Sequence, residues 1–127
     1  MILIDSCVYI SILRNKQDPA KSFARLSQEA DLATCGVVRC EVLRGALSPK
    51  IHASLTAYLN CQIYLPTLNH VWEATERLTW EMDRKGLIIP LTDTIIAATA
   101  LLANARVLTA DRHFEKVPGL TVMNYPY

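Results

Sequence analysis

The sequence predicts an α/β fold in three layers, α/β/α, with a short and mainly parallel central sheet covered by helices on both faces. Short apolar runs rich in Ile, Leu and Val alternate along the chain with longer segments whose apolar residues recur at helical spacing. Strands of a parallel sheet are buried on both faces, so they are typically continuous apolar runs. The alternation of the two kinds of segment favours a sheet between two helical layers.

Five short apolar runs are the expected strands. They are residues 1–4, 32–35, 63–65, 106–109 and 120–123. Asp5 ends the first run and Pro66 stops the third, as expected for residues that interrupt a strand.

Helices are expected between these strands. They are residues 7–14, 20–30, 37–47, 49–59, 70–86 and 90–103. Asp18 and Pro19 should open the second helix, as its cap and first-turn residue. Asn69 is expected to cap the fifth helix, which Gly86 ends. Either Thr92 or Asp93 could cap the last.

Length and composition predict a single domain that spans residues 1–127. A chain of 127 residues, 51% of them hydrophobic, can bury one core. No basic leader precedes the first apolar run, and the longest uncharged stretch elsewhere, residues 94–105, is well short of the ~20 needed to cross a bilayer. We therefore expect a soluble cytoplasmic protein without a membrane partner. The net charge of +1 neither indicates nor excludes nucleic-acid binding.

The four cysteines are expected to be buried, reduced thiols. Cys7, Cys35, Cys40 and Cys61 lie within apolar runs, without a C-x-x-C pair or histidines at zinc-binding spacing.

Four carboxylates stand beside buried segments. Asp5 follows the first strand, Asp111 follows the fourth, Asp93 begins an apolar helix, and Glu41 lies inside another helix. In open α/β sheets, sites gather at the carboxyl ends of the strands, near the switch in strand order. The fold would bring several of these acids to one edge of the sheet.

Each of these acids also has a structural explanation when it is taken singly. Asp5 could begin the first helix, and Asp111 could belong to a turn. Glu41 could pair with Arg39 or Arg44 on its own helix, a contact that contributes ~0.3 kcal/mol. Their joint placement is what favours a site.

A cluster of carboxylates predicts cation chemistry. Two carboxylates ~4 Å apart repel by ~4 kcal/mol at an effective dielectric constant of 20, so such a group must hold protons or bind a cation. Oxygen ligands suit Mg²⁺ or Mn²⁺. Such an ion can activate a water as nucleophile and screen the charge of a phosphodiester. This is the chemistry of phosphoryl hydrolysis.

Four segments also resemble a known family. They are "LIDSCVYI", "VVRCEVLRG", "PLTDTIIAATALL" and "VLTADRHFEKVPGL". They resemble, in order and over essentially the whole chain, the acidic motifs of PIN-domain proteins, and most closely the VapC-type ribonuclease toxins of toxin–antitoxin pairs. The resemblance implies a PIN-like fold and a divalent-metal-dependent endoribonuclease that uses Mg²⁺, with Mn²⁺ as a substitute.

The resemblance also assigns roles to residues. Its catalytic acids map onto Asp5, Glu41, Asp93 and Asp111. Asp5 and Asp93 would be direct metal ligands. Glu41 and Asp111 would complete the pocket, through water or a second metal, and help to orient the attacking water.

The hydroxyls beside the acids have a supporting role in this interpretation. Ser6 and Thr109 could hold a ligand carboxylate or a water. Family members usually carry a small polar residue where this chain has Cys7. The family further implies an RNA substrate, a homodimer, and a VapB-like antitoxin that masks a groove near the acids.

Basic residues flank the acidic motifs. Arg39, Arg44, Arg112 and Lys116 could contact RNA phosphates or form a solvated rim, and the sequence does not decide between the two.

Three further residues receive structural interpretations. His113 is expected to be a surface histidine rather than a general base. Trp72 and Trp80 are expected in core or interface packing rather than base stacking.

Two other function classes compete with a nuclease. An aspartyl phosphatase would need a second Asp at position 7, where this chain has Cys7, and a receiver domain would need paired acids and a late lysine. The third possibility is a non-catalytic PIN-fold module that binds RNA or protein, against which the presence of all four acids argues.

Overall fold

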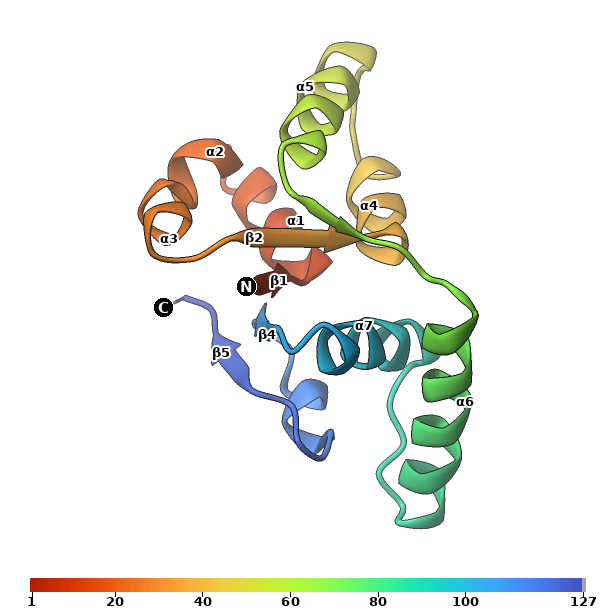
Figure 1. The fold of residues 1–127 in the computed structure, drawn as a ribbon. Helices are drawn as coiled ribbons and strands as arrows, with labels where there is room; N and C mark the ends of the chain where they lie inside the picture. Colours follow the sequence, from red (N-terminus) through yellow and green to blue (C-terminus); the bar gives the residue numbers. More distant parts are fainter. Residues whose placement is uncertain (127) are drawn as a thin grey trace.

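The computed structural model describes residues 1–126 and contains a five-stranded sheet (Figure 1). Its strands are β1 (Ile2–Ile4), β2 (Leu32–Cys35), β3 (Ile63–Leu65), β4 (Arg106–Thr109) and β5 (Val122–Asn124). The strand order is β3-β2-β1-β4-β5, and every neighbouring pair is parallel. The predicted parallel sheet is confirmed. Only the last strand is displaced, since it begins and ends later than expected.

Seven α-helices and one 3₁₀ helix lie among residues 1–126. They are α1 (Ser6–Arg14), α2 (Pro19–Ser22), α3 (Ala24–Glu29), α4 (Gly36–Leu43), α5 (Pro49–Asn60), α6 (Asn69–Arg84), α7 (Leu91–Leu102) and η1 (Arg112–Lys116).

Two predicted helices are shorter or broken. Residues 20–30 form two short helices that meet at Phe23, because the chain turns there and places the ring in the core, edge-on to Tyr9 with centroids 5.4 Å apart. The helix predicted over residues 37–47 ends at Leu43. Ser48 accepts a hydrogen bond from the Ile51 amide and starts α5, so the residues between form a connection.

The expected caps are only partly correct. Asp18 caps α2 as predicted, by accepting from the Ala20 amide. Asn69 does not cap α6, because it is already helical and Leu68 precedes it. Neither Thr92 nor Asp93 caps α7. Among the described residues Pro90 occupies the cap position, and Asp93 lies in the first helical turn.

The topology places a change in strand order at one edge of the sheet. The chain moves from β1 outward to β2 and β3, and then returns through α6 and α7 to β4 on the other side of β1. Right-handed crossovers in opposite directions place their helices on opposite faces, which gives the predicted three layers. In Figure 1, α5 and α6 accordingly lie far apart. The strand order reverses between β1 and β4, where sites form at the carboxyl ends.

The elements that frame this edge are rigidly packed. All of β1 is buried, and so are Thr94 to Ala100 of α7, which packs on β4 and α4. Gly86, with a φ of 71°, ends α6 as predicted: its amide and that of Leu87 bond back to the last helical turn. None of the helices within residues 1–126 has the length and apolar character to cross a bilayer.

Burial was predicted wrongly for two of the cysteines, and for the tryptophans the core alternative is excluded while interface packing stays a prediction. All four thiols are free, but Cys40 and Cys61 are exposed, because α4 and α5 direct other residues to the core. Trp72 and Trp80 are 45% and 61% exposed on the outer side of α6, which excludes the core interpretation. Arg84 lies over the Trp80 ring at 5.0 Å.

Candidate metal centre

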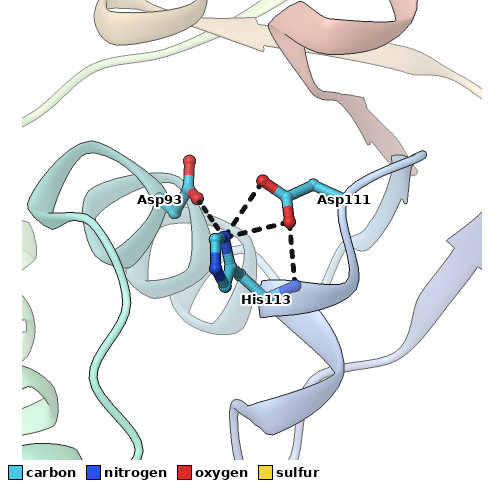
Figure 2. A group of neighbouring side chains, drawn as sticks. All are labelled: Asp93, Asp111 and His113. Atoms are coloured by element: carbon cyan, nitrogen blue, oxygen red, sulfur yellow. Dashed lines mark hydrogen bonds and ion pairs between the residues drawn. The ribbon is translucent and has the colours of Figure 1, made fainter.

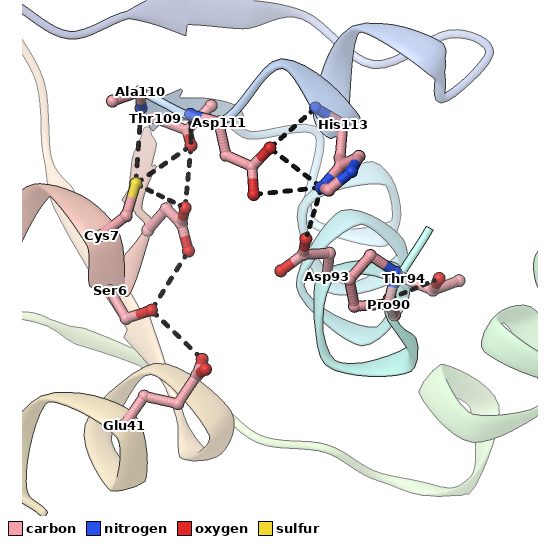
Figure 3. A network of polar contacts seen from close by, with 11 residues as sticks. Ser6, Cys7, Glu41, Pro90, Asp93, Thr94, Thr109, Ala110, Asp111 and His113 are labelled. Atoms are coloured by element: carbon pink, nitrogen blue, oxygen red, sulfur yellow. Dashed lines mark hydrogen bonds and ion pairs between the residues drawn. The ribbon is translucent and has the colours of Figure 1, made fainter. Parts of the chain in front are cut away.

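Asp5 is the most tightly held acid. It directly follows β1, is 3% exposed, and its amide bonds to the Leu108 carbonyl of β4. Its Oδ2 accepts from the Thr109 hydroxyl at 2.8 Å and from the Cys7 thiol at 2.9 Å, and Ser6 Oγ lies 3.4 Å from its Oδ1 (Figure 3). These donors fix the carboxylate at the carboxyl end of the central strand.

Ser6 connects Asp5 to Glu41. Its hydroxyl also lies 3.2 Å from Glu41 Oε1 on α4. A hydroxyl carries one proton, so it donates to one of the two carboxylates at a time. Burial raises the pKa of Glu41, and the charge of Asp5 raises it further, against the lowering effects of Ser6 and Arg44. A proton on Glu41 or a bound cation would therefore reduce the repulsion between Glu41 and Asp5.

Thr109 connects Asp5 to Asp111. Its fully buried hydroxyl donates to Asp5 and accepts from the Asp111 amide at 2.9 Å. Asp111 in turn caps η1, because its Oδ1 accepts from the His113 amide at 2.9 Å. Thr109, at the end of β4, thus fixes the Asp5 carboxylate and the backbone of Asp111.

Asp93 enters the same pocket from α7. Its Oδ2 lies 3.6 Å from Nδ1 of His113, which is also 3.0 Å from Asp111 Oδ1 (Figure 2). Burial raises the pKa of Asp93 to about 6, and the charges of Asp5 and Asp111 add to this effect. The positive end of the helix dipole at the first turn favours the ionised form by only ~0.5 kcal/mol.

The donor set fits a hard divalent cation. The four predicted acids meet in one network (Figure 3), and burial and mutual repulsion raise the pKa of two of them. A divalent cation relieves this repulsion and is bound best by carboxylate oxygens. One oxygen each of Asp93 and Asp111 and one nitrogen of His113 lie within 4.8 Å of one another, close enough to share an ion.

His113 is the site residue that the sequence interpretation missed. Its side chain is 43% exposed, so it does lie at the surface, but its ring contacts both Asp93 and Asp111. The signal was the spacing Asp111-x-His113, because a capping Asp accepts a hydrogen bond from the backbone N–H of the second following residue and so brings that residue close to its carboxylate.

The predicted arginines differ in their surroundings. Arg39 is held by Asn60 at 2.9 Å and lies over the Tyr64 ring at 5.9 Å. Arg44 is close enough to Glu41 to lower its pKa, and Arg112 is exposed at the start of η1. Arg44 and Arg112 thus remain open to a polyanion beside the acids, whereas Arg39 is engaged with the fold.

A groove of about 490 Å³ adjoins Glu41. Glu41 and Arg44 line it together with apolar residues of α1, α4 and the following connection, including Ile10, Leu13 and Val42. A groove with apolar walls and a charged side is suited to a partner segment that is itself amphipathic.

Comparison with known proteins identifies the family. The PIN domain model matches residues 2–120. The chain belongs to the PIN domain family. Ribonuclease VapC11 from Mycobacterium tuberculosis is 30% identical over 129 residues, which cover 95% of this chain and 94% of that protein. Ribonuclease VapC4 from the same organism is 28% identical over 123 residues, with the same coverage.

Solved structures share this PIN fold. VapBC2 from Rickettsia felis, bound to a promoter DNA fragment, matches with a TM-score of 0.82 at 22% identity over 98% of each chain. A toxin–antitoxin complex from Klebsiella pneumoniae matches with a TM-score of 0.74 at 21% identity, covering 100% of this chain and 98% of that one. At such identities the likeness establishes the fold alone.

Proposed function

We propose that this protein is a divalent-metal-dependent endoribonuclease, the toxin of a VapBC-type toxin–antitoxin pair, in which residues 1–127 form one PIN domain acting in the cytoplasm. The observation that carries the proposal is the convergence of four carboxylates beside the carboxyl ends of β1 and β4. The full-length similarity to proteins named VapC ribonucleases supports RNA as the substrate.

In this proposal the four acids have two different roles. Asp5 and Asp93 bind Mg²⁺, or Mn²⁺ in its place, and Glu41 and Asp111 complete the pocket and orient the attacking water. The bound cation supplies charge neutralisation for the scissile phosphodiester and lowers the pKa of water. Asp5 is oriented beforehand by its hydrogen bonds, so little reorganisation is needed.

Other residues support these acids. Thr109 and Ser6 hold the ligand carboxylates in place, as outer partners do in metal sites. Arg44 and Arg112 contact phosphates of the RNA. Arg39 is a weaker candidate because Asn60 and Tyr64 already engage it.

The groove beside Glu41 is the proposed binding site of a VapB-like antitoxin. A segment with apolar side chains would fill the apolar walls, and its acidic residues would pair with Arg14 and Arg44, which both line the groove. Occupation of the groove would cover Glu41 and deny RNA access to the acids. The toxin–antitoxin complex with the same fold supports this kind of partner.

A homodimer is also proposed. Leu68, Trp72 and Leu102 are large apolar residues that are 55%, 45% and 50% exposed on or beside α6 and α7. Pairing of two copies would remove this surface from water. Sedimentation equilibrium of the chain and of Trp72→Glu tests this assembly, and a wild-type monomer at all concentrations would contradict it.

The deciding experiment is cleavage of bulk cellular RNA by the partner-free protein. It compares Mg²⁺ or Mn²⁺ with a chelator, and the wild type with Asp5→Asn and Asp93→Asn. Asp83→Asn, at an exposed position of α6, is the matched control. We expect metal-dependent cleavage that both site variants lower by more than about 100-fold, the upper range for outer partners of metal ligands.

Other outcomes have defined meanings. Cleavage that survives the chelator or both site substitutions would show that this site is not responsible. If the wild type neither cleaves RNA nor binds Mn²⁺ at millimolar concentrations, the non-catalytic binding module becomes the better description.

A further inference from the structure

His113 occupies a position that the proposed chemistry does not use. It is the second residue of η1, and the capping hydrogen bond from its amide to Asp111 fixes the start of that helix. The same carboxylate therefore sets where the imidazole lies. Figure 2 shows the ring between Asp93 and Asp111, with Nδ1 directed at both.

The distances suit a shared ion. Nδ1 lies 3.0 and 3.2 Å from the two oxygens of Asp111 and 3.6 Å from Oδ2 of Asp93. Ligand atoms on opposite sides of a cation with bonds of ~2.1 Å are ~4.2 Å apart, and adjacent ones are closer. The three groups lie within 4.8 Å, so small side-chain rotations suffice to surround an ion.

We propose that His113 is a nitrogen ligand to the cation bound at Asp93, beside Asp111, so that the centre has a mixed nitrogen and oxygen donor set and prefers Mn²⁺ to Mg²⁺. This inference rests on the metal-dependent nuclease proposed above and deepens it. Imidazole is a borderline ligand that suits first-row transition metals, whereas Mg²⁺ favours oxygen alone. A centre built only from the four acids would lack this preference.

The same contacts have a second interpretation, in which His113 is only a counter-ion of the two carboxylates. A protonated ring would neutralise part of their charge and would have to leave when a cation enters. The two roles predict opposite changes in cation affinity when His113 is substituted. Removal of a ligand weakens cation binding, while removal of a competing counter-ion strengthens it.

The direct test is pulsed electron paramagnetic resonance of the full chain loaded with Mn²⁺. The protein is prepared in ordinary form and with ¹⁵N-labelled histidine. We expect nitrogen couplings that change on histidine labelling and disappear in His113→Gln. This readout on the wild type depends on neither folding of the variant nor catalytic activity. Absence of a histidine coupling in the Mn²⁺-loaded wild type would overturn the proposal.

Calorimetric titrations with MnCl₂ and MgCl₂ give the second measurement. His113→Gln should lower the affinity for Mn²⁺ by at least about tenfold and the affinity for Mg²⁺ by much less. His52→Gln, at an exposed position of α5, should change neither. Equal loss of affinity for both ions would contradict the Mn²⁺ preference that nitrogen ligation confers, and tighter binding in His113→Gln would identify a counter-ion.

RNA cleavage measured in parallel separates the two proposals. Metal-dependent cleavage by wild type without histidine coupling would reject His113 as a ligand and leave the nuclease intact. A wild type that binds neither ion would reject both.

Discussion

The two halves of the acidic pocket are held in different ways. Asp5 is 3% exposed and accepts hydrogen bonds from Thr109 and Cys7, which belong to β4 and α1. Asp93 is also largely covered, yet within residues 1–126 the polar contact of its carboxylate is with the imidazole of His113 alone, at 3.6 Å. The charge of Asp5 is stabilised by hydrogen bonds within the fold, whereas the charge of Asp93 is left to be neutralised by a bound cation.

This difference separates folding from function within one site. Hydrogen bonds to a buried carboxylate stabilise the native state, so the protein gains from Asp5 without a cation. An ionised carboxylate without donors destabilises the native state, and the raised pKa of Asp93 is the sign of this cost. A cation that binds Asp93 relieves this unfavourable free energy, which strengthens cation binding.

Substitution of each acid by its amide should give the largest contrast. Asp5→Asn and Asp93→Asn should both abolish RNA cleavage, but they should change the stability of the metal-free protein in opposite directions. Asp5→Asn loses charged hydrogen bonds, at about 1–3 kcal/mol of unfolding free energy. Asp93→Asn removes a repelled charge and should raise the melting temperature. Thermal unfolding with chelator at pH 8 measures both.

The control for this pair is Asp83→Asn, which should leave the melting temperature unchanged. Addition of Mn²⁺ should stabilise the wild type by mass action and should stabilise neither site variant. A lower melting temperature for Asp93→Asn than for wild type in chelator would show that the two halves do not differ in the manner described.

Thr109→Val tests the better-held half alone. The substitution keeps the shape of the side chain, but it removes the donor to Asp5 and the acceptor of the Asp111 amide. Loss of such an outer partner should reduce metal affinity or cleavage by about 10–100-fold. It should also lower the unfolding free energy by about 1–3 kcal/mol. Titration calorimetry and thermal unfolding give the two values.

Thr34→Val is the matched control. Thr34 is fully buried, and its hydroxyl has no hydrogen-bond partner among the residues described. Its removal should therefore be neutral or stabilising, with unchanged metal affinity. Equal losses in the two variants would mean that Thr109 contributes only to packing.

The pH dependence should distinguish Asp93 from the rest of the site. The pKa of Asp93 rises from ~3.9 in an unfolded chain to about 6 in the native protein. Between these values the native state holds a proton that the unfolded state has released. The stability contribution of Asp93 is therefore fully present below pH ~4 and is lost as the pH rises through about 6.

Two measurements test this loss of stability with rising pH. In chelator, the difference in melting temperature between Asp93→Asn and wild type should widen as the pH rises toward 6 and stay constant above it. Mn²⁺ affinity should fall by about tenfold per pH unit below 6, because a proton then competes for the carboxylate. A temperature difference that does not vary with pH would refute the raised pKa.

The sequence predicted the better-held half of the site more completely than the other. Asp5, at the end of an apolar strand, and Thr109 and Ser6, beside acids, are local features of the sequence. The contact of His113 with Asp93 joins residues from two elements. It depends on how η1 packs on α7, which no local pattern encodes.

Other misses have the same physical origin. Asp93 appeared to be a cap because acids favour helix starts, but Pro90 fixed the start of the helix earlier. Cys40 and Cys61 lie in apolar sequence, yet the helical phase of α4 and the end of α5 place them outside. Phase and packing, rather than composition, decided these positions.

The smallest expected effect concerns Cys7, the thiol of the better-held half. Burial raises its pKa to about 11, and the charge of Asp5 and the hydrogen bond to it act in the same direction. Thiolates are the reactive form, so Cys7 should react slowly with iodoacetamide at pH 8, while exposed Cys40 and Cys61 react first. Mass spectrometry of tryptic peptides gives the order.

Substitution of the neighbouring acid then sharpens the comparison. In Asp5→Asn the thiol loses both the adjacent charge and its anionic acceptor, so alkylation of Cys7 should accelerate while that of Cys40 stays constant. Cys7 contacts Asp5, Thr109 and Ala110 rather than Asp93, so Asp93→Asn should leave the rate unchanged. Equal acceleration of Cys7 alkylation in both variants would indicate a general loosening of the structure around the acids. It would contradict the distinction between Asp5, which accepts hydrogen bonds within the fold, and Asp93, which is left to bind a cation.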